Sequence, residues 1–221
     1  MRIAKDCPVT LIGGGEVQAD DLNIAMAAAP SLVAADGGAD RALALGQTPE
    51  AVIGDFDSLT DKARAALPNA ALHHDPDQNS TDFDKALGGI SAPLVIGVGF
   101  LGARLDHQMA AMNTLVRFPK QRCILLGAHE VVFLCPPSFR LDMADDAPVS
   151  LFPMGAVEGV SDGLKWPIAG LHFAPDGQVG TSNAAIGPIE IAVTAPKMLL
   201  MLPKAVFTAV VGALGQTSSH W

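Results

Sequence analysis

The sequence predicts an α/β N-terminal domain with a mostly parallel sheet flanked by helices, followed by an all-β sandwich C-terminal domain. Through residue 128, short apolar runs alternate with stretches of helical length, which is typical of parallel strands joined by right-handed helical crossovers. From residue 129 on, short β-prone runs are separated by Pro and Gly turns, which favours a small sandwich or barrel. We therefore expect two domains, at residues 1–128 and 129–221.

The strands of the first domain are expected where brief apolar runs are bounded by Gly, Asp or Pro, because strands buried on both faces lack polar alternation. These runs are Val9–Ile12, Leu32–Ala35, Ala51–Ile53, Leu94–Val98 and Cys123–Leu126. Helices are expected between them, at Asp21–Ala29, Ala39–Leu45, Thr60–Leu67, Thr81–Gly88 and Arg104–Phe118. Thr60 stands at the N-cap position of the third helix, and Ser80 and Thr81 stand at the start of the fourth.

The second domain is expected to consist of short strands, because no amphipathic stretch of helical length interrupts it before the last segment. The strands are expected at Val131–Leu134, Val149–Phe152, Ala156–Val160, Leu171–Phe173, Ile189–Val193 and Met198–Leu202.

Composition indicates a folded protein that binds neither nucleic acid nor membrane. The chain has 221 residues, 49% apolar and 17% charged, so it can bury a core without metal or disulfide support. A net charge of −9 would repel a nucleic-acid backbone, and no apolar run approaches the roughly 18–20 residues of a bilayer crossing. The N-terminus does not resemble a signal peptide, and Cys7, Cys123 and Cys135 lack the spacing of a zinc site. We expect reduced thiols in or near the core and a cytoplasmic location.

Carboxylates follow several of the predicted strands. Asp36 ends the second strand, Asp55 and Asp57 follow the third, and Asp82 and Asp106 open helices. Ligands of open α/β sheets bind beyond the carboxyl ends of the strands, where all of these side chains are expected. Asp55 and Asp57 would repel each other unless a cation such as Mg²⁺ lay between them, although a solvated loop that caps the next helix is the alternative. The acidic residues at neighbouring strand ends favour the metal.

Glycines and cations near these carboxylates could contact phosphate. Gly13–Gly15 could bring backbone N–H groups to a phosphate or simply form a turn, and Gly37 follows Asp36. Lys85 could contact a phosphate or pair with Asp82 or Asp84, and Asp106, next to Arg104, could instead be an N-cap. The sequence contains no P-loop, dinucleotide fingerprint, H-E-x-x-H motif or G-x-S-x-G elbow.

The second domain carries one cluster with possible chemistry. Trp166 precedes a proline and could stack on a cationic heterocycle, to which Ser182 and Asn183 could hydrogen-bond. The alternative is a core tryptophan and a turn formed by Ser182 and Asn183.

Six segments together resemble the thiamine pyrophosphokinase (thiamin diphosphokinase) family, and they occur in the family's order across both halves of the chain. They are DGGADRAL (Asp36–Leu43), GDFDSL (Gly54–Leu59), DQNSTDFDKAL (Asp77–Leu87), GARLDHQMAAMNTL (Gly102–Leu115), GLKW (Gly163–Trp166) and TSN (Thr181–Asn183). The chain departs from the family pattern at Asp40, Asn79, Leu105 and His107.

The resemblance implies a catalytic domain at 1–128 that binds nucleotide and Mg²⁺, and a thiamine-binding sandwich at 129–221. It implies transfer of the diphosphoryl group of ATP to the hydroxyl of thiamine, giving thiamine diphosphate and AMP, by a homodimer with active sites at the subunit interface. The implied catalytic residues are Asp55, Asp57, Asp82 and Asp106, the first three holding Mg²⁺. Those implied around ATP and its phosphates are Asp36, Gly37, Gln78, Thr81, Lys85 and Arg104. Trp166, Ser182 and Asn183 would contact thiamine, and the general base stays open between Asp82 and Asp106.

Two other functions are compatible with these residues. One is a diphosphokinase that acts on another heterocyclic alcohol, of the pterin type, which the GLKW and TSN segments disfavour. The other is a non-catalytic module that binds Mg-nucleotide, which loss of Asp55, Asp57 or Asp82 would have favoured.

Overall fold

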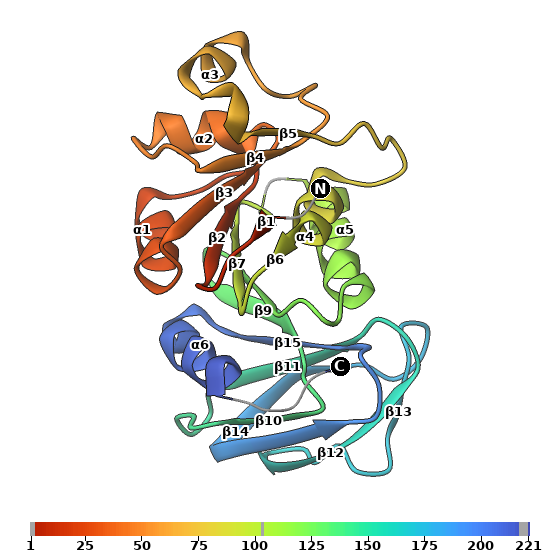
Figure 1. Ribbon diagram of the computed structural model, residues 1–221. Coiled ribbons are helices and arrows are strands. Elements are labelled where there is room, and N and C mark those ends of the chain that lie inside the picture. The colour runs from red at the N-terminus through yellow and green to blue at the C-terminus, as the bar shows by residue number, and fades with distance from the viewer. Residues whose placement is uncertain (1–2, 103, 217–220) are drawn as a thin grey trace. The chain divides into compact units, whose positions relative to one another are not determined.

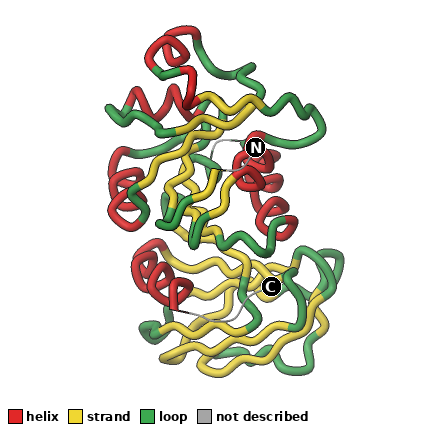
Figure 2. The backbone as a smooth tube through the Cα atoms, in the orientation of Figure 1, coloured by secondary structure: helices red, strands yellow, loops and turns green. Residues whose placement is uncertain are grey.

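The computed structural model describes residues 3–102, 104–216 and 221. The chain forms two compact units. The N-terminal unit contains the described residues up to Thr114 together with Leu125–Ala128, and the C-terminal unit contains Leu115–Ile124 and the described residues from His129 on. Helices flank the strands of the first unit, and strands dominate the second (Figure 2). The expected boundary at residue 128 differs from this division at Leu115–Ile124, and as a boundary between functional domains it stays a prediction.

The N-terminal unit is built on a parallel sheet, as the sequence predicts. Its strand order is β7 (Val95–Val98), β2 (Val9–Ile12), β3 (Ser31–Ala35), β4 (Ala51–Gly54) and β5 (Leu72–His74), with every neighbouring pair parallel. β8 (Cys123–Leu126), whose last two residues belong to this unit, neighbours β7. β2, β3, β4, β7 and β8 are buried along their whole length, which explains their continuous apolar sequences.

The order of this sheet creates a topological switch point. The chain proceeds from β2 through β3 and β4 to β5 on one side, and then returns to place β7 on the other side of β2. The loops that leave β2 and β7 therefore lead to helices on opposite sides of the switch point, at the carboxyl edge where open α/β folds bind their ligands.

The expected helices are present with shifted ends. They are α1 (Ala19–Ala28), α2 (Gly38–Ala44), α3 (Asp61–Ala66), α4 (Asp82–Gly89) and α5 (Leu105–Arg117). In Figure 1, α1 and α2 lie to the left of the parallel sheet, and α4 and α5 lie to its right. Thr60 caps α3 as predicted, because its hydroxyl accepts a hydrogen bond from the Ala63 N–H at 3.2 Å.

Three short strands of this unit were not predicted from the sequence. β1 (Ile3–Ala4) pairs with β6 (Ile90–Ser91), and β5 forms the edge of the main sheet. β1 and β6 have two residues each and β5 reads Leu-His-His, so none shows a periodicity that the sequence could reveal.

The C-terminal unit is an antiparallel β structure, which confirms the expected sandwich. Its strands are β9 (Glu130–Leu134), β10 (Ser138–Leu141), β11 (Pro148–Pro153), β12 (Val157–Leu164), β13 (His172–Phe173), β14 (Gly180–Val193) and β15 (Met198–Pro203). β14 is the central strand: its first part pairs with β11 on one side, and its last part pairs with β10, while β12 pairs along the other side. A strand that changes partners in this way is how two layers of a sandwich share one element.

The unit also departs from the expected pattern. β14 begins nine residues before the predicted Ile189–Val193 run, at Gly180, because it continues through polar residues that carry no apolar alternation. β10 was not predicted, and the last segment forms the 3-10 turn η2 (Lys204–Val206) and helix α6 (Phe207–Gln216). None of the helices within residues 3–102 and 104–216 combines the length and apolar composition that a bilayer crossing requires. Cys123 and Cys135 are buried as expected, but Cys7 is exposed.

A buried hydrogen bond ties α4 to α5. Thr81 and Asp84 form a capping box at the start of α4, in which the Thr81 hydroxyl accepts from the Asp84 N–H and the Asp84 carboxylate accepts from the Thr81 N–H. The other carboxylate oxygen of Asp84 accepts a hydrogen bond from the Thr114 hydroxyl on α5, at 2.8 Å. Both side chains are buried, so this bond holds the N-terminus of α4 in place.

The substitution Thr114→Val should therefore destabilise the protein, because it keeps the side-chain shape while removing a donor to a buried carboxylate. We expect a loss of about 1–3 kcal/mol in the free energy of unfolding, measured by urea denaturation. Thr208→Val on α6 is the matched control, since Thr208 is exposed. Equal stabilities of the two variants would show that the bond contributes nothing.

Candidate active site

A cavity of about 610 Å³ lies at the carboxyl edge of the parallel sheet, within the N-terminal unit. Its walls come from the loops after β2, β3, β4 and β7 and from the starts of α4 and α5. Of the residues predicted for the site, those that line this cavity are Gly37, Asp55, Asp57, Gln78, Thr81, Asp82, Lys85 and Arg104. The volume falls within the range of about 300–1,000 Å³ typical of small-molecule sites.

Three carboxylates converge at the ends of β3 and β4. Asp36, Asp55 and Asp57 each offer an oxygen, and these oxygens lie within 4.8 Å of one another. The sequence-based metal set contained Asp82 in place of Asp36, whereas the structure groups Asp36 with the Asp55 and Asp57 pair. Asp82 is the first residue of α4 and is not part of this group of three. Its place among metal ligands stays a prediction.

The backbone around this cluster has an uncommon conformation. Asp36 and Phe56 have φ angles of 42° and 67°, in the left-handed region that non-glycine residues rarely adopt. The Phe56 N–H donates to Asp36 Oδ2 at 3.1 Å, and the Phe56 ring lies 5.5 Å from both the Arg64 guanidinium and the His74 ring. Gly54 permits this packing, because a Cβ there would lie 2.8 Å from the Asp36 Cβ. Such strained residues cluster at functional sites.

Asp36 is the most perturbed acid of the cluster. It is completely buried, and its Oδ1 accepts no hydrogen bond from the described part of the chain. Burial, followed by the charges of Asp82, Asp55 and Asp57, raises its pKa to about 7. An orphaned buried oxygen beside two further carboxylates suits a hard divalent cation, which takes oxygen ligands and offsets their repulsion. The residues therefore fit Mg²⁺.

Lys85 is the one cation buried against these acids in the described chain. Its ammonium lies 2.6 Å from Asp55 Oδ2, a partner that was not predicted, and 3.8 Å from Asp82 Oδ1, one of the two predicted partners. Its hydrogen bond lowers the pKa of Asp55. Burial lowers the pKa of Lys85, but the contacts with Asp55 and Asp82 outweigh it and hold that pKa above its ordinary value. Burial also raises the pKa of Asp82, despite the nearby Lys85 charge.

The remaining predicted residues occupy different surroundings. Gln78 donates to Asp55 Oδ2 at 3.0 Å, so its amide contacts the acidic cluster. Arg104 and Asp106 form an exposed ion pair of 2.6 Å, which lowers the pKa of Asp106 and raises that of Arg104. Asp106 lies inside the first turn of α5 and not at an N-cap, and it does not line the cavity. Ala103, in the same segment, lies outside the described residues.

Two glycine loops form the wall at the switch point. Gly13, Gly14 and Gly15 follow β2, and Gly99 follows β7 with a φ of 79°. A Cβ on Gly15 would lie 2.5 Å from the Gly99 carbonyl oxygen, so side chains are excluded where the loops meet. The sequence indicated only the first loop. Gly99 and Phe100 were missed, since no motif marks them, and His107 was noted only as a departure from the family pattern.

The residues expected to bind a heterocycle lie in the C-terminal unit. The Trp166 side chain is 55% exposed, which contradicts the core alternative, and the Lys165 ammonium lies 5.2 Å from its ring centroid. Ser182 is exposed and has a φ of 63°. Asn183 is buried, and its side-chain amide binds the Trp166 backbone, so the turn alternative does not describe it.

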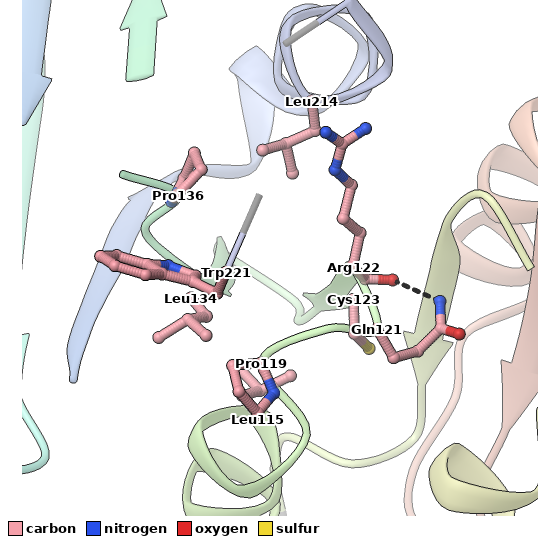
Figure 3. Close-up of a pocket in the computed structure, with 9 residues that line it drawn as sticks. All are labelled: Leu115, Pro119, Gln121, Arg122, Cys123, Leu134, Pro136, Leu214 and Trp221. Carbon is pink, nitrogen blue, oxygen red and sulfur yellow. Dashed lines mark hydrogen bonds between the residues drawn. The ribbon is translucent and has the colours of Figure 1, made fainter. Parts of the chain in front are cut away.

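The second tryptophan has a different environment. Trp221 lines a hollow of about 30 Å³ with Leu134, Pro136, Leu214 and Arg122, within the C-terminal unit (Figure 3). Its indole N–H donates to the Cys135 carbonyl at 2.8 Å. A hollow of this volume has room for little more than a water molecule, so we assign Trp221 to packing.

Comparisons with known proteins match both parts of the chain. Residues 22–126 match the family model described as thiamin pyrophosphokinase, catalytic domain, and residues 139–198 match thiamin pyrophosphokinase, vitamin B1 binding domain. Thiamine pyrophosphokinase 3 of Oryza sativa subsp. japonica is 29% identical over 68% of this chain and 69% of its own length. Thiamin pyrophosphokinase 1 of Caenorhabditis elegans is 27% identical over 68% of this chain and 70% of its own length.

Solved structures share the fold. Thiamin pyrophosphokinase from Candida albicans superposes with a TM-score of 0.75 at 16% identity, covering 90% of this chain and 89% of that one. The yeast thiamin pyrophosphokinase gives 0.74 at 17% identity, covering 94% and 89%, and the Bacillus subtilis enzyme gives 0.70 at 21%, covering 89% and 98%.

The buried Asp36 carboxyl should make the metal-free protein less stable as the pH rises. Its pKa in the folded state, about 7, lies above the ordinary value of 3.8, so the folded state retains a proton that the unfolded chain releases. The stability lost on this account grows between about pH 4 and pH 7 and then levels off. Asp36→Asn should remove the effect, and in chelator its advantage over the parent should reach the order of a few kcal/mol at pH 8 and vanish near pH 4.

Thermal denaturation at several pH values measures this difference. The exposed Asp176→Asn serves as the control for removing one carboxylate. Added Mg²⁺ should raise the melting temperature of the parent more than that of Asp36→Asn. A difference between parent and Asp36→Asn that does not change with pH would contradict the burial argument.

Proposed function

Since the chain belongs to the thiamin pyrophosphokinase family, we propose that this enzyme transfers the diphosphoryl group of ATP to the hydroxyl of thiamine, giving thiamine diphosphate and AMP. The observation that carries the proposal is the acidic cluster of Asp36, Asp55 and Asp57 beside a cavity of nucleotide size, in a chain whose two parts match the family's catalytic and vitamin-binding models. The match of residues 139–198 to the vitamin B1 binding model argues against a pterin acceptor.

A cation held by the acidic cluster would explain how a cavity lined by carboxylates accepts a polyanion. We assign Asp36, Asp55 and Asp57 as the group that would hold Mg²⁺, with Asp82 as a further candidate from the family motif. Bound there, Mg²⁺ would offset the negative charge of the carboxylates and of the phosphates. Lys85, which the neighbouring carboxylates hold in its charged form, and Arg104 supply positive charge along the cavity wall. Diphosphoryl transfer depends mainly on such positioning and charge neutralisation.

The glycine loops and the remaining acids complete the proposed nucleotide site. Backbone N–H groups of Gly13–Gly15 can approach phosphate where no side chains intervene. The thiamine hydroxyl must lose a proton as it attacks the β-phosphorus. Asp82 lines the cavity and Asp106 does not, so we favour Asp82 as the acceptor of that proton.

Thiamine carries a cationic ring, for which the half-exposed Trp166 is the proposed stacking partner. The Lys165 ammonium already lies over this ring, so a cationic ligand on the same face would have to displace it. Ser182 is exposed and directly precedes Asn183 in the sequence. It is the residue that we propose to hydrogen-bond to thiamine.

We further propose a homodimer with active sites at the subunit interface and a cytoplasmic location, both of which stay predictions. The carboxylate cluster and Trp166 belong to different units of the chain, so either one subunit or two could supply them.

Product analysis tests the reaction directly. With ATP, Mg²⁺ and thiamine, chromatography should show AMP and thiamine diphosphate forming at equal rates. Asp57→Asn, which is isosteric and exposed, should lower kcat by about 10²-fold or more while leaving the melting temperature unchanged. Release of ADP with thiamine monophosphate would refute the diphosphoryl transfer, and absence of any product would refute the acceptor.

Complementation between two defective variants tests the shared site. If each site takes Asp57 from one subunit and Trp166 from the other, a mixture of Asp57→Asn and Trp166→Ala chains forms heterodimers with one intact site. After subunit exchange, we expect activity at low thiamine to recover to about a quarter of the parent level, because half of the dimers are mixed. A mixture no more active than the sum of its parts would place both residues in the same subunit's site.

A further inference from the structure

We propose that Asn183 is a positioning residue that holds Trp166 in place through its backbone, and that it does not itself contact the substrate. The inference concerns the second unit, and it rests on the proposed function only in taking Trp166 as the residue that contacts thiamine. Three features of the structure carry it: the hydrogen bonds of the Asn183 amide, the ladder that these bonds extend, and the bulge that turns the amide inward.

Three of the four hydrogen bonds that the Asn183 amide can make go to backbone groups. Its Oδ1 accepts hydrogen bonds from the Trp166 N–H at 3.1 Å and from the Ala184 N–H at 2.9 Å. Its Nδ2 donates to the Trp166 carbonyl at 2.7 Å. Only 7% of the residue is exposed, whereas Trp166 is 55% exposed. An amide so buried and so bonded has little capacity left for a ligand.

These bonds continue the pairing of β12 with β14 beyond the end of β12. Leu164 pairs with Ala185, and the Lys165 N–H donates to the Ala184 carbonyl at 2.8 Å. The same register sets Trp166 opposite Asn183, whose side-chain amide provides the acceptor for the Trp166 N–H and the donor for the Trp166 carbonyl. Pro167 follows and has no N–H. Trp166 is therefore the last residue before the proline whose N–H and carbonyl can both be hydrogen-bonded.

A β-bulge gives Asn183 its inward direction. Val149 of β11 pairs with Asn183 and Leu151 pairs with Gly180, so that Thr181 and Ser182 together oppose Ser150. In a regular strand Thr181 and Asn183 would share one face, yet Thr181 and Ser182 are both exposed and Asn183 is buried. The left-handed φ of Ser182, 63°, marks the residue at which the alternation is reset. Bulges of this kind re-aim side chains beside functional sites.

As a result, the Trp166 side chain is exposed while its backbone N–H and carbonyl are both hydrogen-bonded to Asn183. Fixing the Trp166 backbone before a ligand arrives removes an ordering cost from binding. Loss of the Asn183 amide should therefore raise KM for thiamine by about fivefold to tenfold, with little change in KM for ATP or in kcat at saturating thiamine.

Fluorescence provides a measurement that needs neither substrate nor activity. The chain has two tryptophans, so in a Trp221→Phe background the emission comes from Trp166 alone. Relative to that parent, Asn183→Ala should lower the steady-state anisotropy of Trp166 at unchanged circular dichroism. Asn183→Asp keeps the acceptor and loses the donor to the Trp166 carbonyl. It should lower the anisotropy at pH 8 and restore it at acidic pH, where a protonated carboxyl can donate again. Asn183→Ala should show no such recovery.

Gln178→Glu is the matched control. It makes the same amide-to-carboxylate change in the same unit, at an exposed side chain that donates to the Val179 carbonyl at 2.8 Å. It should alter neither anisotropy nor kinetics.

The two readouts separate this inference from the proposed function. Anisotropy that is unaffected by Asn183→Ala, or an Asn183→Asp variant that does not recover at acidic pH, would overturn the positioning role whatever the substrate. A rise in KM for thiamine without a change in anisotropy would also overturn it, since Asn183 would then contact thiamine itself. Lowered anisotropy with normal thiamine kinetics would support the positioning of the Trp166 backbone by Asn183 and refute the proposed stacking of thiamine on Trp166.

Discussion

The arrangement of the N-terminal unit depends on the repulsion among carboxylates that the parallel sheet brings together. β3 and β4 are neighbours, and an aspartate directly follows each of them, so Asp36 and Asp55 must approach each other at the carboxyl edge. Lys85 neutralises Asp55 from α4, and the capping box and the Thr114 hydroxyl hold the start of that helix. Asp36 receives no such partner. Its buried charge is unfavourable until a cation or a proton compensates it, and the strained backbone at Asp36 and Phe56 adds to that cost.

Features of the sequence that depend on local pattern could be predicted, and those that depend on tertiary geometry could not. The buried strands are continuous apolar runs, and Asp36, Asp55 and Asp57 stand directly after two of them, so a shared edge was foreseeable. The grouping of Asp36 with Asp55 and Asp57 was not, because it depends on tertiary contacts such as that of Lys85 with Asp55 and on Gly54 leaving room for the Asp36 side chain. Gly99 and Phe100 contribute to the cavity only because the strand order returns β7 to the side of β2.

The C-terminal unit shows the same limit in a different form. Its strands follow turn signals in the sequence, but β14 extends through Gly180–Val193 without apolar alternation and contains a bulge that no composition marks. The sequence led us to treat Ser182 and Asn183 alike, as polar residues near a heterocycle. The bulge separates them, since it leaves Ser182 exposed and buries Asn183 against the Trp166 backbone. The one extra residue of the bulge thus gives these two adjacent polar residues different surroundings.

Both units accept local costs that their cores must offset. In the first, Asp36 and Phe56 have left-handed backbones, and Asp36 Oδ1 has no hydrogen-bond partner among the described residues; both adjoin strands that are buried along their length. In the second, an exposed tryptophan and a left-handed serine adjoin the pairing of β14 with β11 and β12. In each case the unfavourable feature is a short segment within or next to a strand that pairs with neighbours on both sides, so its conformation is determined by that pairing. This explains why these residues can hold a defined geometry before any ligand is present.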